Sequence, residues 1–301
     1  QPGKDAHRLD ELSKRPVTQS AEDAHRLDEL CKWIEDNSWD AGLLEARGRL
    51  YAQLGRHDEA ARDFAAALGI ANSDIQRWKV YDVAARDDEV FSRVAALVPH
   101  DKELRIARGR FLAYHGQYER ALLAYAPLID TYGAGWETDH YARLLVLTRR
   151  DDEYRDFCRR WSSLLGKTGV PTEAHWLVVV CTAGPQSGVE PARIVRWAQQ
   201  GVALAPENAV SLFDLGAAYY RAGEYKQAVH YLQESNVRFG TQRTAHNPFL
   251  LAMAHHWLGQ HAASREWYEM GIDVLKSRTP QSGSDYPPAG SLWDGNPLSE
   301  W

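Results

Sequence analysis

The chain has 301 residues and a formal net charge of −6, with 35 Lys and Arg against 41 Asp and Glu. A hydrophobic fraction of 44% and a charged fraction of 25% are ordinary for folded globular proteins, which excludes wholesale disorder. The acidic balance argues against nucleic acid as the main partner, because nucleic-acid-binding surfaces are basic. No apolar run approaches the roughly 20 residues that span a bilayer, so we expect no membrane span.

The cysteines and the N-terminus bear on the compartment. Cys31, Cys158 and Cys181 are far apart in the sequence and form no CxxC pair, and such an odd, sparse set suits a reducing compartment. The N-terminus is polar and charged, without a signal-peptide pattern. We expect a cytoplasmic protein, and the start at Gln1 instead of Met indicates either a processed chain or, as we favour, an excerpt of something longer.

The first 40 residues contain the octapeptide DAHRLDEL twice, at 5–12 and at 23–30. HRLD at 25–28 superficially resembles the HRD loop of protein kinases, but that loop needs Asp directly after Arg and Asn five residues later. The chain also has no Gly-rich nucleotide loop, so the kinase interpretation fails. Pro16 disfavours one continuous helix, so we expect two short helices, irregular or capping. Their buried positions would be Leu9, Leu12, Leu27 and Leu30.

An internal repeat begins at about residue 41 and gives the main signal of the sequence. The spacing that starts with RGRLY at 47–51 returns at RGRFL, 108–112, and at LGAAY, 215–219, with a looser copy at LAMAH, 251–255. A glycine inside a helix costs ~1 kcal/mol relative to alanine, which is tolerable where a second helix approaches closely. The glycines at this position are Gly48, Gly109 and Gly216.

Turn and stop signals divide each copy into two helices. Glycine recurs between the two helices of a pair, where a left-handed turn suits it. Pro99 and Pro206 fall where the second helix should stop. Three further segments have the pattern of degenerate helix pairs, at 75–101, 136–166 and 172–206. We see no alternation of polar and apolar residues long enough to predict a β-strand. The turn glycines are Gly55, Gly116, Gly223 and Gly259.

This spacing resembles the tetratricopeptide repeat (TPR), a 34-residue helix–turn–helix. The resemblance implies an all-α fold, a TPR-like α-solenoid of about six to seven helix-turn-helix pairs, several of them degenerate. We expect N-terminal helices at 1–40, the solenoid at 41–279 and a Pro/Gly-rich tail at 280–301. Whether residues 1–20 belong to the array stays open.

A narrower resemblance covers 136–275, carried by DDEYRDFCRRW at 151–161, DLGAAYYRAGEYKQAVHYLQES at 214–235 and MAHHWLG at 253–259. This order of segments resembles the C-terminal TPR region of planctomycete-type bacterial proteins, where it follows a serine/threonine kinase domain or WD40 repeats. The resemblance implies an adaptor or regulatory region without catalytic activity. Relatives continue with a charged helix after the last repeat, whereas this sequence stops at Trp301.

Histidines form one cluster that we test for metal binding. Adjacent His255 and His256 would point about 100° apart on a helix, which suits one ligand but no chelating pair. In the repeat register His255 takes the packed position of Tyr51 and Tyr219, so we expect a core histidine. No G-x-S-x-G elbow or cysteine signature is present. We therefore expect no enzyme, no catalytic residue, no cofactor and no metal.

Solenoids bind along the concave face lined by the first helix of each pair. In the first clear repeat this face is polar, with Glu45 and Arg49 where the carboxylate clamp of chaperone-tail binders would want Lys and Asn. In the last two repeats it is aromatic and contains Met, which suits an amphipathic helix or an apolar peptide. The predicted partner-binding groove comprises Phe213, Tyr220, Arg221, Phe249, Met253, His256 and Trp257.

We therefore predict a non-catalytic TPR scaffold that recognises a helix or peptide of unknown identity within a larger bacterial assembly. One alternative is a structural subunit that packs against other chains and self-associates. A less favoured one is the accessory region of a signalling kinase whose catalytic domain lies elsewhere. The chain's own tail could also fill the groove, since 280–301 contains Tyr286, Leu292, Trp293 and Trp301.

Overall fold

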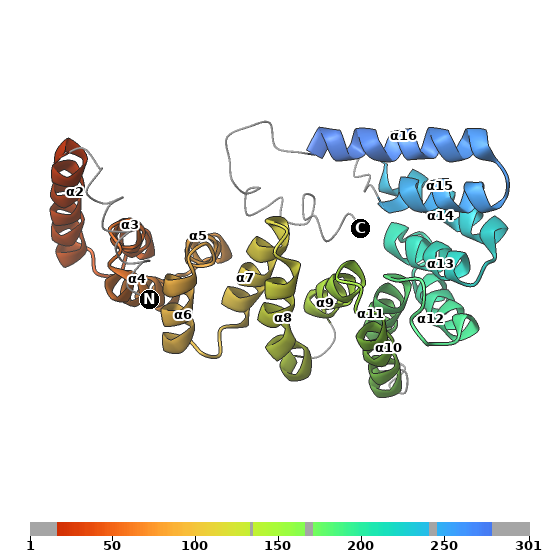
Figure 1. Ribbon diagram of the computed structural model, residues 1–301, viewed down its shortest axis with the longest axis horizontal. Coiled ribbons are helices and arrows are strands. Elements are labelled where there is room, and N and C mark those ends of the chain that lie inside the picture. Colours follow the sequence, from red (N-terminus) through yellow and green to blue (C-terminus); the bar gives the residue numbers. More distant parts are fainter. Residues whose placement is uncertain (1–16, 133–134, 166–170, 241–245, 279–301) are drawn as a thin grey trace. The chain divides into compact units, whose positions relative to one another are not determined.

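The computed structural model describes residues 17–132, 135–165, 171–240 and 246–278, and within these ranges the chain forms fifteen α-helices and no strand (Figure 1). This confirms the all-α prediction. One leading helix precedes seven helix pairs. The helices are α2 (Val17–Asp36), α3 (Ala41–Gln53), α4 (His57–Ile70), α5 (Asp74–Ala84), α6 (Asp88–Leu97), α7 (Lys102–Tyr114), α8 (Tyr118–Tyr132), α9 (Trp136–Leu147), α10 (Asp151–Leu165), α11 (Pro171–Thr182), α12 (Pro191–Leu204), α13 (Ala209–Arg221), α14 (Tyr225–Phe239), α15 (His246–Trp257) and α16 (His261–Arg278).

The chain divides into two compact units, Gln1–Arg108 and Gly109–Trp301, with the boundary inside α7. Within the second unit, α11 packs against α9 and α13, and α13 packs against α15, so the first helices of successive pairs lie next to one another. The second helix of each pair contacts the first helix of the next, as α12 does with α13 and α14 with α15. This stacking of antiparallel pairs is the α-solenoid arrangement that the sequence predicted.

Polar side chains fix where several helices begin. The carboxylate of Asp40 accepts hydrogen bonds from the backbone N–H of Gly42 and Leu43 at the start of α3. Asp87 does the same for the first turn of α6. These caps satisfy N–H groups that have no partner inside the helix. Two short acidic side chains thus set the first residues of α3 and α6.

The helix glycines lie where two helices of one pair touch. A Cβ added to Gly48 would lie 2.8 Å from the ring of Phe64, and one on Gly109 would lie 2.5 Å from Tyr125. A Cβ on Gly216 would lie 2.6 Å from Leu232. The missing side chain therefore permits the close approach that the repeat pattern predicts.

The turn glycines adopt the left-handed conformation, with φ between 70° and 78° at Gly55, Gly116, Gly223 and Gly259. The α9–α10 pair has no glycine at this place. Arg149 takes the left-handed conformation instead, with φ of 59°, which is unusual for a residue with a side chain. This departure explains why the pair looks degenerate in sequence although its helices are complete.

The N-terminal region is described from Val17 onwards. The second DAHRLDEL copy lies inside α2, a helix of 20 residues that begins directly after Pro16. Leu30 is buried as expected, whereas Leu27 is half-buried. The first copy and the 280–301 tail lie outside the described residues. No described helix has the length and apolar character needed to cross a membrane.

Candidate functional site

Two phenylalanines of the predicted groove pack toward the protein. The half-buried ring of Phe213 packs against a core cluster formed by Ala228, Leu232, Leu251 and Ala254. Phe249 on α15 faces α16, where its ring lies 5.7 Å from that of Tyr268 and a Cβ on Gly271 would come within 2.7 Å of it. These two rings hold the last repeats together.

Arg221 makes a contact that spans two repeats. Its Nε and Nη2 donate to the backbone oxygen of Thr182 over 2.9 Å and 2.8 Å. Thr182 is the last residue of α11, so its carbonyl has no partner within that helix. Burial lowers the pKa of Arg221, and its guanidinium lies 5.5 Å from the ring centroid of Tyr220. Arg221 therefore ties α13 to the end of α11.

A row of aromatic side chains joins the end of α13, the start of α14 and the end of α15. The ring of Tyr225 lies 5.6 Å from Tyr220 and stacks on Trp257 at 5.7 Å with an interplanar angle of 6°. Trp257 is 62% exposed, and Met253, one turn earlier on α15, is 43% exposed. We call Tyr220, Tyr225, Met253 and Trp257 the aromatic surface.

His256 borders the aromatic surface. It is exposed, and its ring lies 6.2 Å from that of Trp257 and 5.4 Å from that of His261. The structure thus brings Tyr220, Met253, His256 and Trp257 to one region. The repeat pattern did not predict Tyr225, because this residue begins the second helix of its pair and falls outside the positions that TPR patterns assign to the groove.

An acid–base pair with a buried carboxylate crosses from α11 to α13. Nδ1 of His175 lies 2.6 Å from Oδ2 of Asp214, whose side chain is only 7% exposed. Burial raises the pKa of Asp214, and the charge of Asp139 on α9 adds to this while His175 opposes it. For His175, burial lowers the pKa, but the hydrogen bond to Asp214 and the two carboxylate charges outweigh it and raise the pKa overall. The pair therefore favours the protonated imidazole next to a carboxylate.

A buried histidine in the same unit has the opposite tendency. His140 on α9 is fully enclosed, and its Nδ1 lies 3.0 Å from the hydroxyl oxygen of Tyr125. Burial lowers the pKa of His140 to about 3, with the charges of Arg110 and Arg143 acting in the same direction. His140 is therefore neutral at physiological pH, and its role is in packing.

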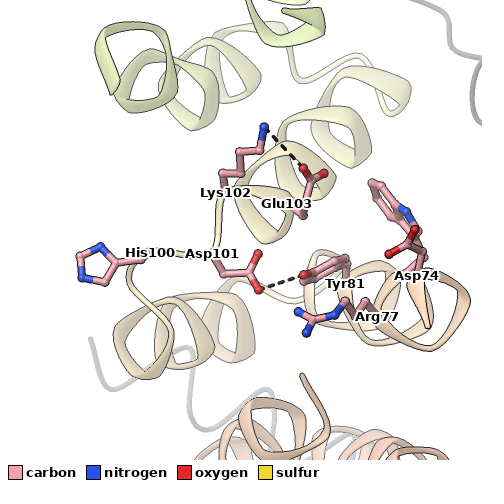
Figure 2. A pocket seen from close by; sticks show the side chains of 8 residues that line it. Asp74, Arg77, Tyr81, His100, Asp101, Lys102 and Glu103 are labelled. Atoms are coloured by element: carbon pink, nitrogen blue, oxygen red, sulfur yellow. Dashed lines mark hydrogen bonds and ion pairs between the residues drawn. The ribbon is translucent and has the colours of Figure 1, made fainter. Parts of the chain in front are cut away.

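The first unit has an open, polar pocket of about 630 Å³ that the sequence did not reveal (Figure 2). The Tyr81 hydroxyl donates to Oδ2 of Asp101 over 2.9 Å, while Oδ1 of Asp101 accepts from the N–H of Leu104. Nζ of Lys102 lies 3.8 Å from the carboxylate of Glu103. The lining carries three carboxylates and two cationic side chains, so charges of both signs face this pocket. Its lining residues are Asp74, Arg77, Trp78, Tyr81, His100, Asp101, Lys102 and Glu103.

Within the described ranges, no three His, Cys, Asp or Glu side chains come together in a way that would hold a metal ion. His255 is buried, and its Nδ1 lies 2.5 Å from Oε1 of Gln260. The position agrees with the core role predicted from the repeat register. Glu45 and Arg49 on α3 form an ion pair with each other.

Comparison with known proteins gives one family match, in which residues 41–74 fit the tetratricopeptide repeat. No curated protein matches the chain in sequence. Similar solved structures include MamA, residues 41 to the end, from Desulfovibrio magneticus RS-1, at 14% identity over 74% of this chain and 97% of that one with a TM-score of 0.32. YrrB, a TPR protein with an unusual peptide-binding site, matches at 14% identity over 81% and 91% of the two chains with a TM-score of 0.31.

A third similar structure is the APC/C hetero-tetramer Cut9–Hcn1, at 12% identity over 77% of this chain and 52% of that one with a TM-score of 0.42. At these identities and TM-scores the similarities assign no ligand and no partner to this chain. The match at 41–74 coincides with α3 and α4, the pair that contains Gly48 and Phe64. The chain therefore carries a tetratricopeptide repeat at residues 41–74 within an all-helical array of stacked helix pairs.

Proposed function

We propose that the chain is a non-catalytic TPR-type scaffold that recognises an apolar peptide or the apolar face of an amphipathic helix on a partner protein. The recognising groups are the residues of the aromatic surface, with His256 at its border. The observation that carries the proposal is the exposure of Met253 and Trp257, one turn apart on α15, beside the stacked ring of Tyr225.

The chemistry of this surface supports recognition of an apolar segment. Trp and Tyr are enriched among residues whose truncation costs most binding energy, because each offers a large rigid area at a low entropic cost. Met adapts its shape to different apolar partners. Burial of apolar area contributes about 25 cal/mol per Å², so covering one exposed Trp and one exposed Met would contribute on the order of 2–4 kcal/mol.

Phe213, Phe249 and Arg221 are assigned a supporting role within this proposal. Their contacts with the core, with α16 and with Thr182 shape the repeats that present the aromatic surface. The resemblance of 136–275 to TPR regions of large bacterial signalling proteins favours a place within a larger assembly. The partner is then a segment of another protein in that assembly.

A displayed peptide library tests the proposal and requires no named partner. Wild-type protein and the variant Met253→Ala/Trp257→Ala are panned in parallel, after circular dichroism has shown equal helicity. Trp39→Ala is the matched control, because Trp39 is 83% exposed and lies in the other unit. We expect peptides with apolar residues at helical spacing to be enriched on the wild type and on the control, and to be lost on the double variant.

Two outcomes would contradict the proposal. Enrichment of the same peptides on the double variant would place recognition on a different surface. A library that gives no enrichment, together with self-association of the wild type in sedimentation velocity, would favour the structural-subunit function instead.

A further inference from the structure

Cys158 on α10 and Cys181 on α11 are far apart in the sequence but meet in the core of the second unit. Both are buried, with exposures of 0% and 1%, and both are free thiols. Cys158 contacts the backbone of α11 at Val180, the residue directly before Cys181. Because α10 ends one helix pair and α11 begins the next, the contact joins two repeats.

We infer that Cys158 and Cys181 form an oxidation site whose product is a disulfide linking α10 to α11. A disulfide requires two cysteines whose Cβ atoms lie roughly 3.5–4.5 Å apart. The α10 and α11 helices pack side by side, and Cys158 already contacts the residue next to Cys181, so the two sulfur atoms need only a small approach. Cys31, the third cysteine, lies in the other unit.

The surroundings hold both thiols in place. The Tyr154 hydroxyl donates to the carbonyl of Val180 over 2.9 Å and accepts from the N–H of Gly184 over 2.9 Å. Sγ of Cys158 lies 3.8 Å from the same Val180 oxygen. A Cβ on Gly184 would lie 2.8 Å from the Tyr154 ring, so the end of α11 is closely packed here. These contacts therefore hold Cys158 against the part of α11 that contains Cys181.

Oxidation proceeds by thiol–disulfide exchange with a low-molecular-weight disulfide such as oxidised glutathione. One cysteine loses its proton, attacks the glutathione disulfide and releases one glutathione thiolate. The second cysteine thiolate then attacks the mixed disulfide and releases the second glutathione. The two cysteines lose two protons and two electrons in total, and the oxidant becomes two molecules of reduced glutathione.

The buried position determines when this reaction occurs. The contact with Cys158 and burial both disfavour the thiolate and raise the pKa of Cys181, so the closed repeat reacts slowly. Exchange requires an opening of α10 from α11 that admits the oxidant. Conditions that open this repeat therefore accelerate oxidation, and the disulfide then prevents the two helices from separating again.

The test uses the full chain with Cys31→Ala, which leaves only the buried pair. The protein is incubated with oxidised glutathione in buffer and in urea below the unfolding transition, alkylated and digested. We expect a cross-linked peptide pair containing Cys158 and Cys181, formed faster in urea. We also expect a rise of the thermal midpoint by roughly 5–10 °C, reversed by dithiothreitol.

The single variants Cys158→Ala and Cys181→Ala, in the same background, serve as controls. Under the same conditions in urea each should accumulate a glutathione adduct on the remaining cysteine and show no rise of the midpoint. The inference is overturned if the Cys31→Ala protein ends with stable glutathione adducts on both cysteines. It is equally overturned if the pair stays reduced in urea while the single variants are modified.

Discussion

Nδ1 of His175 lies 2.6 Å from Oδ2 of Asp214, so a proton-sharing pair joins the first helices of two neighbouring repeats. The pair is 39 residues apart in the sequence and lies beside the carboxylate of Asp139 on a third helix. Removing His175 leaves the carboxylate of Asp214 buried without compensation, which costs more than the pair contributes. The joint between α11 and α13 therefore depends on the protonation state of these groups.

The raised pKa of His175 predicts how this joint responds to pH. The folded state binds the proton more tightly than the unfolded chain, so the stabilisation is fully present below about pH 6.5 and is lost as the pH rises through the folded pKa. In an NMR titration of the imidazole Cε1–H signal we expect a midpoint above about 6.5 for His175. Asp214→Asn should lower this midpoint. A wild-type midpoint below about 6.5 would contradict the assignment.

The lowered pKa of His140 predicts the opposite dependence of stability on pH. Its folded pKa of about 3 lies below the unfolded value, so its stabilising contribution is present above pH 6.5 and is lost as the pH falls. Urea unfolding of the wild type should lose up to about 1.4 kcal/mol per pH unit below about 6.5 from this group. His140→Gln should show a shallower loss. His230→Gln, at an exposed histidine, should follow the wild type, and equal slopes for all three proteins would contradict the burial argument.

Two glycines of the first unit allow a matched test of how close packing affects stability. Gly48→Ala should destabilise the protein by about 1–3 kcal/mol, because its Cβ would meet the fully buried ring of Phe64. Gly69→Ala lies near the end of α4 with nothing within 4 Å of the added Cβ, and should stabilise by up to about 1 kcal/mol. Thermal melts followed by circular dichroism at 222 nm measure both. Equal effects of the two substitutions would show that helix propensity alone determines the change in stability, without a contribution from packing.

Arg221 should behave as a structural residue. Arg221→Lys keeps the charge but loses the two parallel bonds to the Thr182 oxygen, so we expect a loss of about 1–3 kcal/mol in unfolding free energy. Arg159→Lys is the control, because Arg159 lies in the same unit, is 59% exposed and pairs with Asp156 on its own helix. We expect it to change stability by less than about 0.5 kcal/mol. Equal effects of the two substitutions would show that the hydrogen bonds of Arg221 do not stabilise the contact between the repeats.

The sequence predicted the contacts made by residues that recur at a fixed spacing in the repeats. Gly48, Gly109 and Gly216 were assigned to close helix contacts because each comes at the same distance before a packed residue, and the structure confirms all three. Contacts between neighbouring repeats, in contrast, do not recur at a fixed spacing in the sequence. The pairing of His175 with Asp214, or the contact of Cys158 with the backbone next to Cys181, depends on how one helix pair stacks on the next, and no local pattern encodes it.

The predicted groove shows the same limit. The position within the repeat correctly identified Met253 and Trp257 as exposed side chains. The same rule also assigned Phe249 to the groove, although this ring packs on Gly271. Whether a first-helix side chain faces solvent or its own second helix depends on the residue opposite, here a glycine that makes room for the ring. Asp214 carried a weak signal, as a lone carboxylate within the apolar stretch 212–218.

The measurement that tests the central claim most directly is the dissociation constant of a selected peptide, obtained by fluorescence anisotropy for the wild type, Trp257→Ala and Trp39→Ala. We expect Trp257→Ala to weaken binding at least about tenfold, or 1.4 kcal/mol, while its unfolding free energy stays within about 1 kcal/mol of the wild type. Trp39→Ala should bind as the wild type does. Equal dissociation constants for all three proteins would contradict recognition by the aromatic surface.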